Sequence, residues 1–145
     1  MEPTKTHYAY GVFFVTAVAL ADAGLKALAL KLEPVTNGAV GFHLYLNPGV
    51  TGSVEIPLWL VLPFSAALLC ALMLAWRWSH RNKRYGGALG YAAIVVGGAG
   101  NFVDRLIHGH TTDYLKVASS VLNLSDILII AGLLLLLRYH KSVRD

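Results

Sequence analysis

Four long apolar runs alternate with shorter polar connections along the chain. They cover roughly residues 8–32, 56–78, 86–103 and 124–139. A helix needs about 20 predominantly apolar residues to cross a bilayer. The fourth run is the shortest, since its uninterrupted apolar part ends at Leu137 and reaches that length only with its flanking residues. The pattern predicts an all-α integral membrane protein with four transmembrane helices, forming one membrane-embedded domain over residues 1–145.

The connection after the first run has a different pattern. Its segment Val40–Asn47, VGFHLYLN, is rich in residues that favour strands, and Asn47-Pro48-Gly49 follows it with a turn signal. We therefore expect a small β-containing loop on the membrane surface between the first two helices. His43 is interpreted as a surface residue of this strand.

Composition places the chain in a bilayer. Hydrophobic residues make up 56% of the sequence, charged residues make up 14%, and the mean hydropathy is +0.57. Soluble domains carry about 25% charged residues. The single cysteine, Cys70, lies within an apolar run, so the sequence has no disulfide framework and no CxxC metal or redox motif.

Basic residues gather at the ends of the apolar runs. One group of eight is Lys5, Arg77, Arg81, Lys83, Arg84, Arg138, Lys141 and Arg144, against Lys31, Arg105 and Lys116 in the two other connections. Because short basic loops stay in the cytoplasm, this asymmetry predicts that both termini are cytoplasmic. Grouped in this way, the charges report topology and do not form the continuous basic face that nucleic-acid binding requires.

Two charged residues interrupt the first apolar run. Asp22 and Lys26 are four positions apart, so they share one helix face and can pair, which lowers the cost of burying either charge. Two interpretations remain open for them. They are an internal ion pair that holds helices together, or they take part directly in a site.

Most of the remaining polar residues of interest lie between Val96 and Asp126. With the predicted orientation, Asp22, Asp104, Asp113 and Asp126 all fall at the outer ends of helices or in an outer loop. Ionisable residues are costly near hydrocarbon, so a functional site is the first hypothesis for such a cluster. Asn101 lies three residues before Asp104, and Asn123 three before Asp126, so each of these helix ends presents an amide beside a carboxylate.

Carboxylates are the groups best suited to chemistry here. The serines nearby, among them Ser125, have no evident histidine base. Two carboxylates in close proximity share a proton, so that one activates water while the other protonates a carbonyl oxygen. We interpret Asp104 as structural and Asp113 with Asp126 as the dyad. Asp126 lies in the first turn of its helix, where the helix dipole favours the charged form that a base needs.

Two other classes of function compete with this hypothesis. One is a metal site built from His108, His110, Asp113 and Asp104, although the segment has no HExxH motif. The other is a small transporter or proton relay, since acids within spans also serve such paths. Against the relay, the acids gather at one face of the membrane. The glycines around Gly97 are interpreted as helix-packing residues and not as a dinucleotide-binding loop, because no strand precedes them.

Five motifs carry a resemblance to a known family, the bacterial lipoprotein signal peptidases (signal peptidase II). The segment GGAGNFVDR resembles the family's GGAxGNxxDR block, one residue shorter before Asn101, and NLSDILI is similar to its NxADxxI block. Thr112-Asp113-Tyr114 stands at the xD[FWY] position. Asp22 with Lys26 is similar to DxxxK, and Asn47 with Gly49 to NxG.

The resemblance covers nearly the whole chain and implies an aspartic endopeptidase without a cofactor. It would cut signal peptides from diacylglyceryl-modified prolipoproteins at the outer face of the bacterial inner membrane, in contact with membrane lipids, and globomycin would inhibit it. The resemblance assigns catalysis to Asp113 and Asp126. The residues it implies as supports are Asp22, Lys26, Asn47, Gly49, Asn101, Asp104, Arg105 and Asn123.

The chain departs from the family pattern at three places. Residues Val50–Ser53 lead almost directly into the second apolar run, so we expect a reduced outer lid. Ser125 replaces the usual alanine beside the second aspartate, and Ala23-Gly24 replaces a more polar pair in the first run. These differences bear on substrate handling more than on the chemistry.

Overall fold

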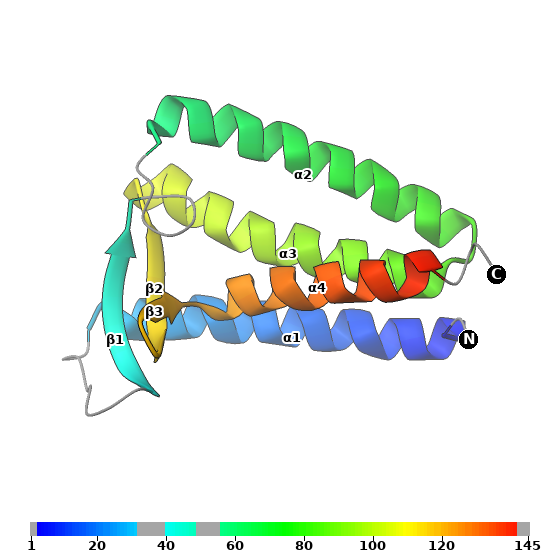
Figure 1. The fold of residues 1–145 in the computed structure, drawn as a ribbon, viewed down its shortest axis with the longest axis horizontal. Helices are drawn as coiled ribbons and strands as arrows, with labels where there is room; N and C mark the ends of the chain where they lie inside the picture. The colour runs from blue at the N-terminus through cyan, green and yellow to red at the C-terminus, as the bar shows by residue number, and fades with distance from the viewer. Residues whose placement is uncertain (1–2, 32–39, 49–55, 142–145) are drawn as a thin grey trace.

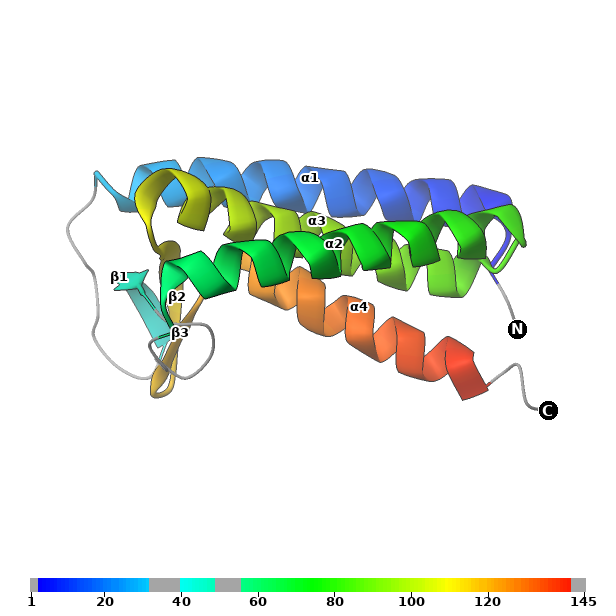
Figure 2. The same ribbon diagram turned by 90° about the horizontal axis from the view of Figure 1, so that it is seen from above.

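Four helices lie side by side and a small sheet covers one end of them (Figure 1). The computed structural model describes residues 3–31, 40–48 and 56–141. The start of the first helix and the end of the last lie at the end of the bundle away from the sheet. The sheet therefore lies at the opposite end of the bundle from these two helix ends, as Figure 2 also shows.

The helices follow the apolar runs closely. They are α1 (Lys5–Ala29), α2 (Leu58–Arg81), α3 (Tyr85–His108) and α4 (Leu124–Lys141). Of these, α1, α2 and α3 are long and apolar enough to cross a membrane, so the protein is membrane-embedded. The predicted end of the first span at residue 32 lies outside the described residues.

The third helix is longer than the sequence pattern indicated. It continues past Val103 to His108, so Arg105 lies in its last turn and the predicted boundary there is wrong. Asp104 anchors this extension, because it is only 9% exposed and bonds both Lys26 on α1 and the backbone N–H of Thr112. Gly109 ends the helix in the left-handed conformation (φ 80°), which glycine adopts without strain.

Small residues let α3 and α4 approach each other closely. A Cβ atom added to Gly97 would lie 2.5 Å from the backbone oxygen of Ser125, and one added to Gly132 would lie 2.6 Å from that of Gly90. No side chain fits at such distances, so backbones meet directly at both points. The packing role predicted for Gly97 is confirmed.

The sheet has three antiparallel strands in the order β1-β2-β3. The predicted strand is present as β1 (Val40–Asn47), whereas β2 (Thr111–Val117) and β3 (Ser120–Leu122) were not predicted. In the register of β1 with β2, Asn47 lies opposite Thr111. The central strand therefore comes from the second outer connection and is paired on both sides.

The other end of the bundle carries aromatic residues. Trp76 donates from Nε1 to the Tyr8 hydroxyl at 2.9 Å, and the Tyr8 ring packs against those of His80 and Tyr85 at centroid distances of 5.1 and 5.5 Å. Amphipathic rings of this kind favour the interface between lipid and water. They join α1, α2 and α3 far from the sheet.

Candidate active site

Asp113 lies on the central strand and is almost fully buried, with 2% of its surface exposed. Its Oδ1 accepts a hydrogen bond from Asn123 Nδ2 at 2.6 Å, and its Oδ2 accepts one from Asn47 Nδ2 at 3.0 Å. Burial raises the pKa of the Asp113 carboxyl to about 6, and the charge of Asp126 adds to the rise, while the two amide donors oppose it. Asp113 therefore holds a proton at higher pH than an ordinary aspartate.

Asp126 lies in the first turn of α4 and takes part in capping it. Its backbone N–H donates to Asn123 Oδ1 at 2.9 Å, and its Oδ2 accepts from the Asn123 backbone N–H at 3.2 Å. This is a reciprocal capping box, encoded by the spacing in Asn-Leu-Ser-Asp. The carboxylate thus sits at the positive end of the helix dipole, as the sequence predicted.

Two asparagines join the carboxylates into one network. Asn101 on α3 donates from Nδ2 to Asp126 Oδ1 at 2.8 Å, and its own Oδ1 accepts from Asn123 Nδ2 at 3.1 Å. Asn123, which is fully buried, also donates to Asp113. Asp113 and Asp126 are therefore positioned on a common amide framework contributed by β1, α3 and the start of α4.

The predicted pair of Asp22 and Lys26 is confirmed and has a third member. Lys26 Nζ lies 3.0 Å from Asp22 Oδ2 and 2.9 Å from Asp104 Oδ2, which links α1 to α3. The same ammonium donates to Asn101 Oδ1 at 3.2 Å. The ion pair is therefore internal, and through Lys26 it also contacts Asn101 of the amide framework.

Asp104, which we interpreted from the sequence as structural, is bonded to two other elements of the fold. It accepts from Lys26 and, at 3.1 Å, from the backbone N–H of Thr112 at the start of β2. Asp104 thus connects the end of α3 to the strand that carries Asp113.

Asp22 is a centre of hydrogen bonds that the sequence did not reveal. Its Oδ1 accepts from the Tyr114 hydroxyl at 2.8 Å and from the Leu124 N–H at 2.9 Å, and its Oδ2 accepts from the Ser125 hydroxyl at 2.7 Å. Burial raises the pKa of Tyr114, so it remains a neutral donor. Tyr114 directly follows Asp113, and Ser125 directly precedes Asp126. This adjacency is the sequence feature that could have pointed to the two residues.

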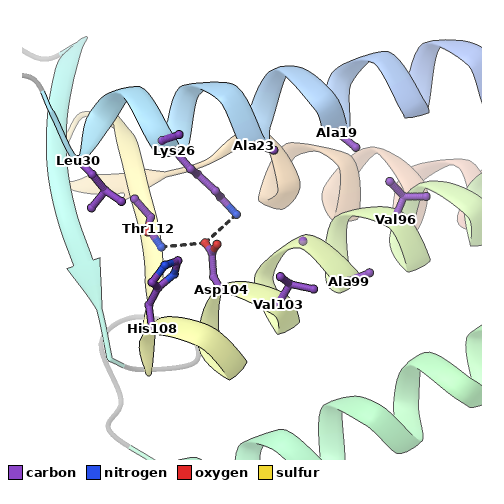
Figure 3. Close-up of a pocket in the computed structure, with 12 residues that line it drawn as sticks. Ala19, Ala23, Lys26, Leu30, Val96, Ala99, Val103, Asp104, His108 and Thr112 are labelled. Atoms are coloured by element: carbon purple, nitrogen blue, oxygen red, sulfur yellow. Dashed lines mark hydrogen bonds and ion pairs between the residues drawn. The ribbon is translucent and has the colours of Figure 1, made fainter.

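An apolar recess of about 480 Å³ lies between α1 and α3. Alanines and valines make up half of its described lining. Lys26 and Asp104 point toward each other in it, near His108 (Figure 3). Neither Asp113 nor Asp126 is among the described residues that line it. The ion pair therefore borders the recess, whereas Asp113 and Asp126 are not part of its described lining.

The remaining candidates are placed as follows. Arg105 interacts electrostatically with Asp126, Asp113 and Asp104. The rings of His108 and His110 stack with centroids 5.9 Å apart. Within residues 3–31, 40–48 and 56–141, no group of three His, Cys, Asp or Glu side chains is arranged as a metal site would require. Gly49 and the expected reduced lid lie outside the described residues.

Comparison with solved structures concerns the fold. The chain is similar to two bacterial membrane enzyme structures, with TM-scores of 0.79 and 0.71 at 15% and 14% sequence identity. The first match covers 94% of this chain and 90% of that one, and the second covers 89% and 90%. The arrangement of four helices and a small sheet is therefore one already observed.

Comparison with sequences identifies the family. The chain is 33% identical over 145 aligned positions to a lipoprotein signal peptidase of Xylella fastidiosa (strain 9a5c), covering 90% of this chain and 87% of that protein. It is 28% identical over 131 positions to one of Sinorhizobium fredii, covering 82% and 78%. The family model for signal peptidase (SPase) II, Peptidase_A8, matches residues 14–140. This match spans most of the chain, which therefore belongs to the signal peptidase II family.

Proposed function

We propose that this protein removes signal peptides from prolipoproteins by aspartic catalysis, with Asp113 and Asp126 as the dyad. Family membership supports the reaction. One observation carries the mechanism: Asp113 and Asp126 are bonded to the same two-asparagine framework, Asn101 and Asn123, at the sheet end of a membrane protein. The neutral amides orient both carboxyl groups without neutralising either one.

The raised pKa of Asp113 supports one division of the two roles. Asp113 carries the proton, and Asp126 acts as the base. Asp126 takes a proton from water, the water oxygen attacks the scissile carbonyl carbon, and Asp113 gives its proton to the carbonyl oxygen. When the resulting tetrahedral species collapses, the carbonyl oxygen returns its proton to Asp113, and the leaving nitrogen takes the proton held by Asp126. The dyad is then ready for another cycle.

The supporting residues act by position. Asn47, Asn101 and Asn123 fix the directions of the carboxyl groups through the bonds described above. Lys26 ties Asp22 on α1 to Asp104 on α3, so the helices beneath the framework cannot separate without breaking an ion pair. Rigid placement of this kind is what lowers the barrier of a two-carboxylate reaction.

We further propose that α4 is a fourth span and that both termini are cytoplasmic. With 18 residues, α4 has a length of about 27 Å, close to the roughly 30 Å of the hydrocarbon core. The basic connection between α2 and α3 lies at the end of the bundle away from the sheet, which would put the site at the outer face of the inner membrane. A reporter active only in the cytoplasm should be active when inserted near Asn82; an inactive one contradicts this topology.

The test of function is direct cleavage of a diacylglyceryl-modified prolipoprotein by the purified protein in detergent. Cleavage before the lipidated cysteine, inhibited by globomycin, is the expected result. Asp113→Asn serves as the matched inactive control, because it changes one oxygen to an amide and leaves the fold in place. Absence of cleavage by the unchanged protein would contradict the proposal and favour the transporter or proton-relay hypothesis.

A further inference from the structure

One buried hydroxyl near the dyad has no partner. Among the described residues, three buried side-chain atoms lack a hydrogen bond, namely His43 Nδ1, His110 Nδ1 and Thr111 Oγ1. The two histidines are only partly buried, and a ring turn exchanges the nitrogen for a carbon. Thr111 is 2% exposed and is therefore buried more deeply than either histidine. Its hydroxyl is the clearest unsatisfied polar group in the described fold.

Strand geometry places this hydroxyl on the same side of the sheet as Asp113. Side chains alternate along a strand, so Thr111 and Asp113, two residues apart on β2, point to the same face. Thr111 also lies opposite Asn47 in the register, and the Asn47 amide donates to Asp113. Opposite residues have Cβ atoms about 5 Å apart. The unpaired hydroxyl is therefore a neighbour of the groups proposed to do the chemistry.

We propose that Thr111 contacts the substrate, by donating its hydroxyl hydrogen to a peptide carbonyl beside the scissile bond. The inference rests on the proposed function and adds a specificity residue to it. A peptide that reaches Asp113 must bring its own backbone carbonyls into a buried site, where each needs a donor. Thr111 offers a donor that the folded protein leaves unused. The cost of leaving it unused in the free enzyme is recovered when substrate binds.

The decisive variant is Thr111→Val, which has nearly the same shape and lacks the hydroxyl. Without the donor, the substrate carbonyl stays unpaired, and kcat/KM should fall about 5- to 100-fold. The contact is made equally in the ground and transition states, so the loss should appear in KM while kcat stays within about twofold. The melting temperature should rise, because the variant no longer buries an unpaired polar atom.

Two further variants complete the experiment. Thr111→Ser keeps the hydroxyl and should keep KM within about threefold of the unchanged enzyme. Thr16→Val makes the same chemical change on the exposed surface of α1, where the hydroxyl bonds only to Val12 O at 3.0 Å of its own helix. That variant should leave both kinetic constants unchanged.

Three results would overturn the inference. The first is an unchanged KM in Thr111→Val, and the second is a loss of activity confined to kcat. The third is a lower melting temperature of this variant, because it would mean that the hydroxyl supports the fold. Failure of the proposed function would look different, because the unchanged enzyme would then not cleave, or Asp113→Asn would cleave normally. All kinetics are measured with the full-length protein and the lipidated prolipoprotein in detergent.

Discussion

Two groups of aspartates lie within one network, and their partners differ. Asp22 and Asp104 each pair with the ammonium of Lys26 and also accept a backbone N–H. Asp113 and Asp126 take side-chain hydrogen bonds from asparagine amides, and Asp126 also accepts the backbone N–H of Asn123. An ammonium between two carboxylates holds them together by charge, whereas a neutral amide orients a carboxyl group without adding a charge beside it. The first group is thus suited to holding helices, and the second to moving protons.

The largest effect is expected from substitutions in the second group, Asp113 and Asp126. Asp113→Asn and Asp126→Asn should each lower the cleavage rate by several orders of magnitude, on the order of 10⁴-fold, because a proton carrier is lost while shape is kept. Both variants should still fold with some loss of stability, since the amide oxygen can keep one of the hydrogen bonds that each carboxylate accepts, while the amide nitrogen faces a donor in place of an acceptor. Cleavage at high enzyme concentration and melting in detergent are the measurements.

The matched control for these variants is Asp104→Asn. It should keep residual cleavage and lose about 1–3 kcal/mol of stability, because Lys26 loses one of its two charged partners. An inert but fully stable Asp104→Asn beside an active Asp113→Asn would reverse the assignment of the two groups.

Next in size is the removal of the shared cation. Lys26→Met leaves Asp22 and Asp104 buried without their common partner, which should cost about 3–5 kcal/mol of stability. Cleavage by the fraction that remains folded should fall less than in the dyad variants. Denaturant unfolding compared with the unchanged protein measures the cost, and a change below about 1 kcal/mol would mean that the ion pair does not hold the helices.

A smaller effect follows from the pKa of Asp113, which folding raises from 3.8 to about 6. The folded protein therefore holds this proton more tightly than the unfolded chain does, and stability falls as pH rises from about 4 to about 6. The rise corresponds to about 3 kcal/mol at most. Melting curves across this range test it. Asp113→Asn should show a flatter dependence on pH, and equal slopes for the two proteins would refute the assignment.

The smallest effect is expected from the histidines of the alternative metal site. The double variant His108→Ala with His110→Ala should change the cleavage rate by less than about threefold, because neither ring touches the dyad framework in the bonds described. Strong chelators should likewise leave the rate unchanged, since two carboxylates need only water. A loss of activity that added metal restores would favour metal catalysis over the dyad.

Much of this arrangement could be predicted from local patterns. Apolar runs gave the four helices because burial in lipid requires continuous apolar sequence, and the strand β1 followed from its residue types and the turn after it. The pairing of Asp22 with Lys26 followed from helical spacing. Asn123 and Asp126 were recognised as neighbours for the same reason, although the capping box itself was not predicted.

The rest depended on contacts between distant segments. Two residues separate the end of α3 from the start of β2. The pairing of β2 with β1 joins segments more than sixty residues apart, which no local pattern specifies. Likewise, Asp104 pairs with Lys26, which lies on another helix. The bonds from Tyr114 and Ser125 to Asp22 also needed the packed structure, because they require three elements to meet at one carboxylate.

The contact at Gly97 has a consequence for anyone who wishes to make this protein more heat-resistant. Replacing glycine by alanine within a helix is a common route to stability, since it reduces the freedom of the unfolded chain. At Gly97 that route is closed, because the added carbon would meet the Ser125 carbonyl at 2.5 Å and push the start of α4 outward. Asp126 follows Ser125 directly, so the displaced group would be a proposed catalytic carboxylate. Alanine at this position should therefore lower both heat resistance and turnover.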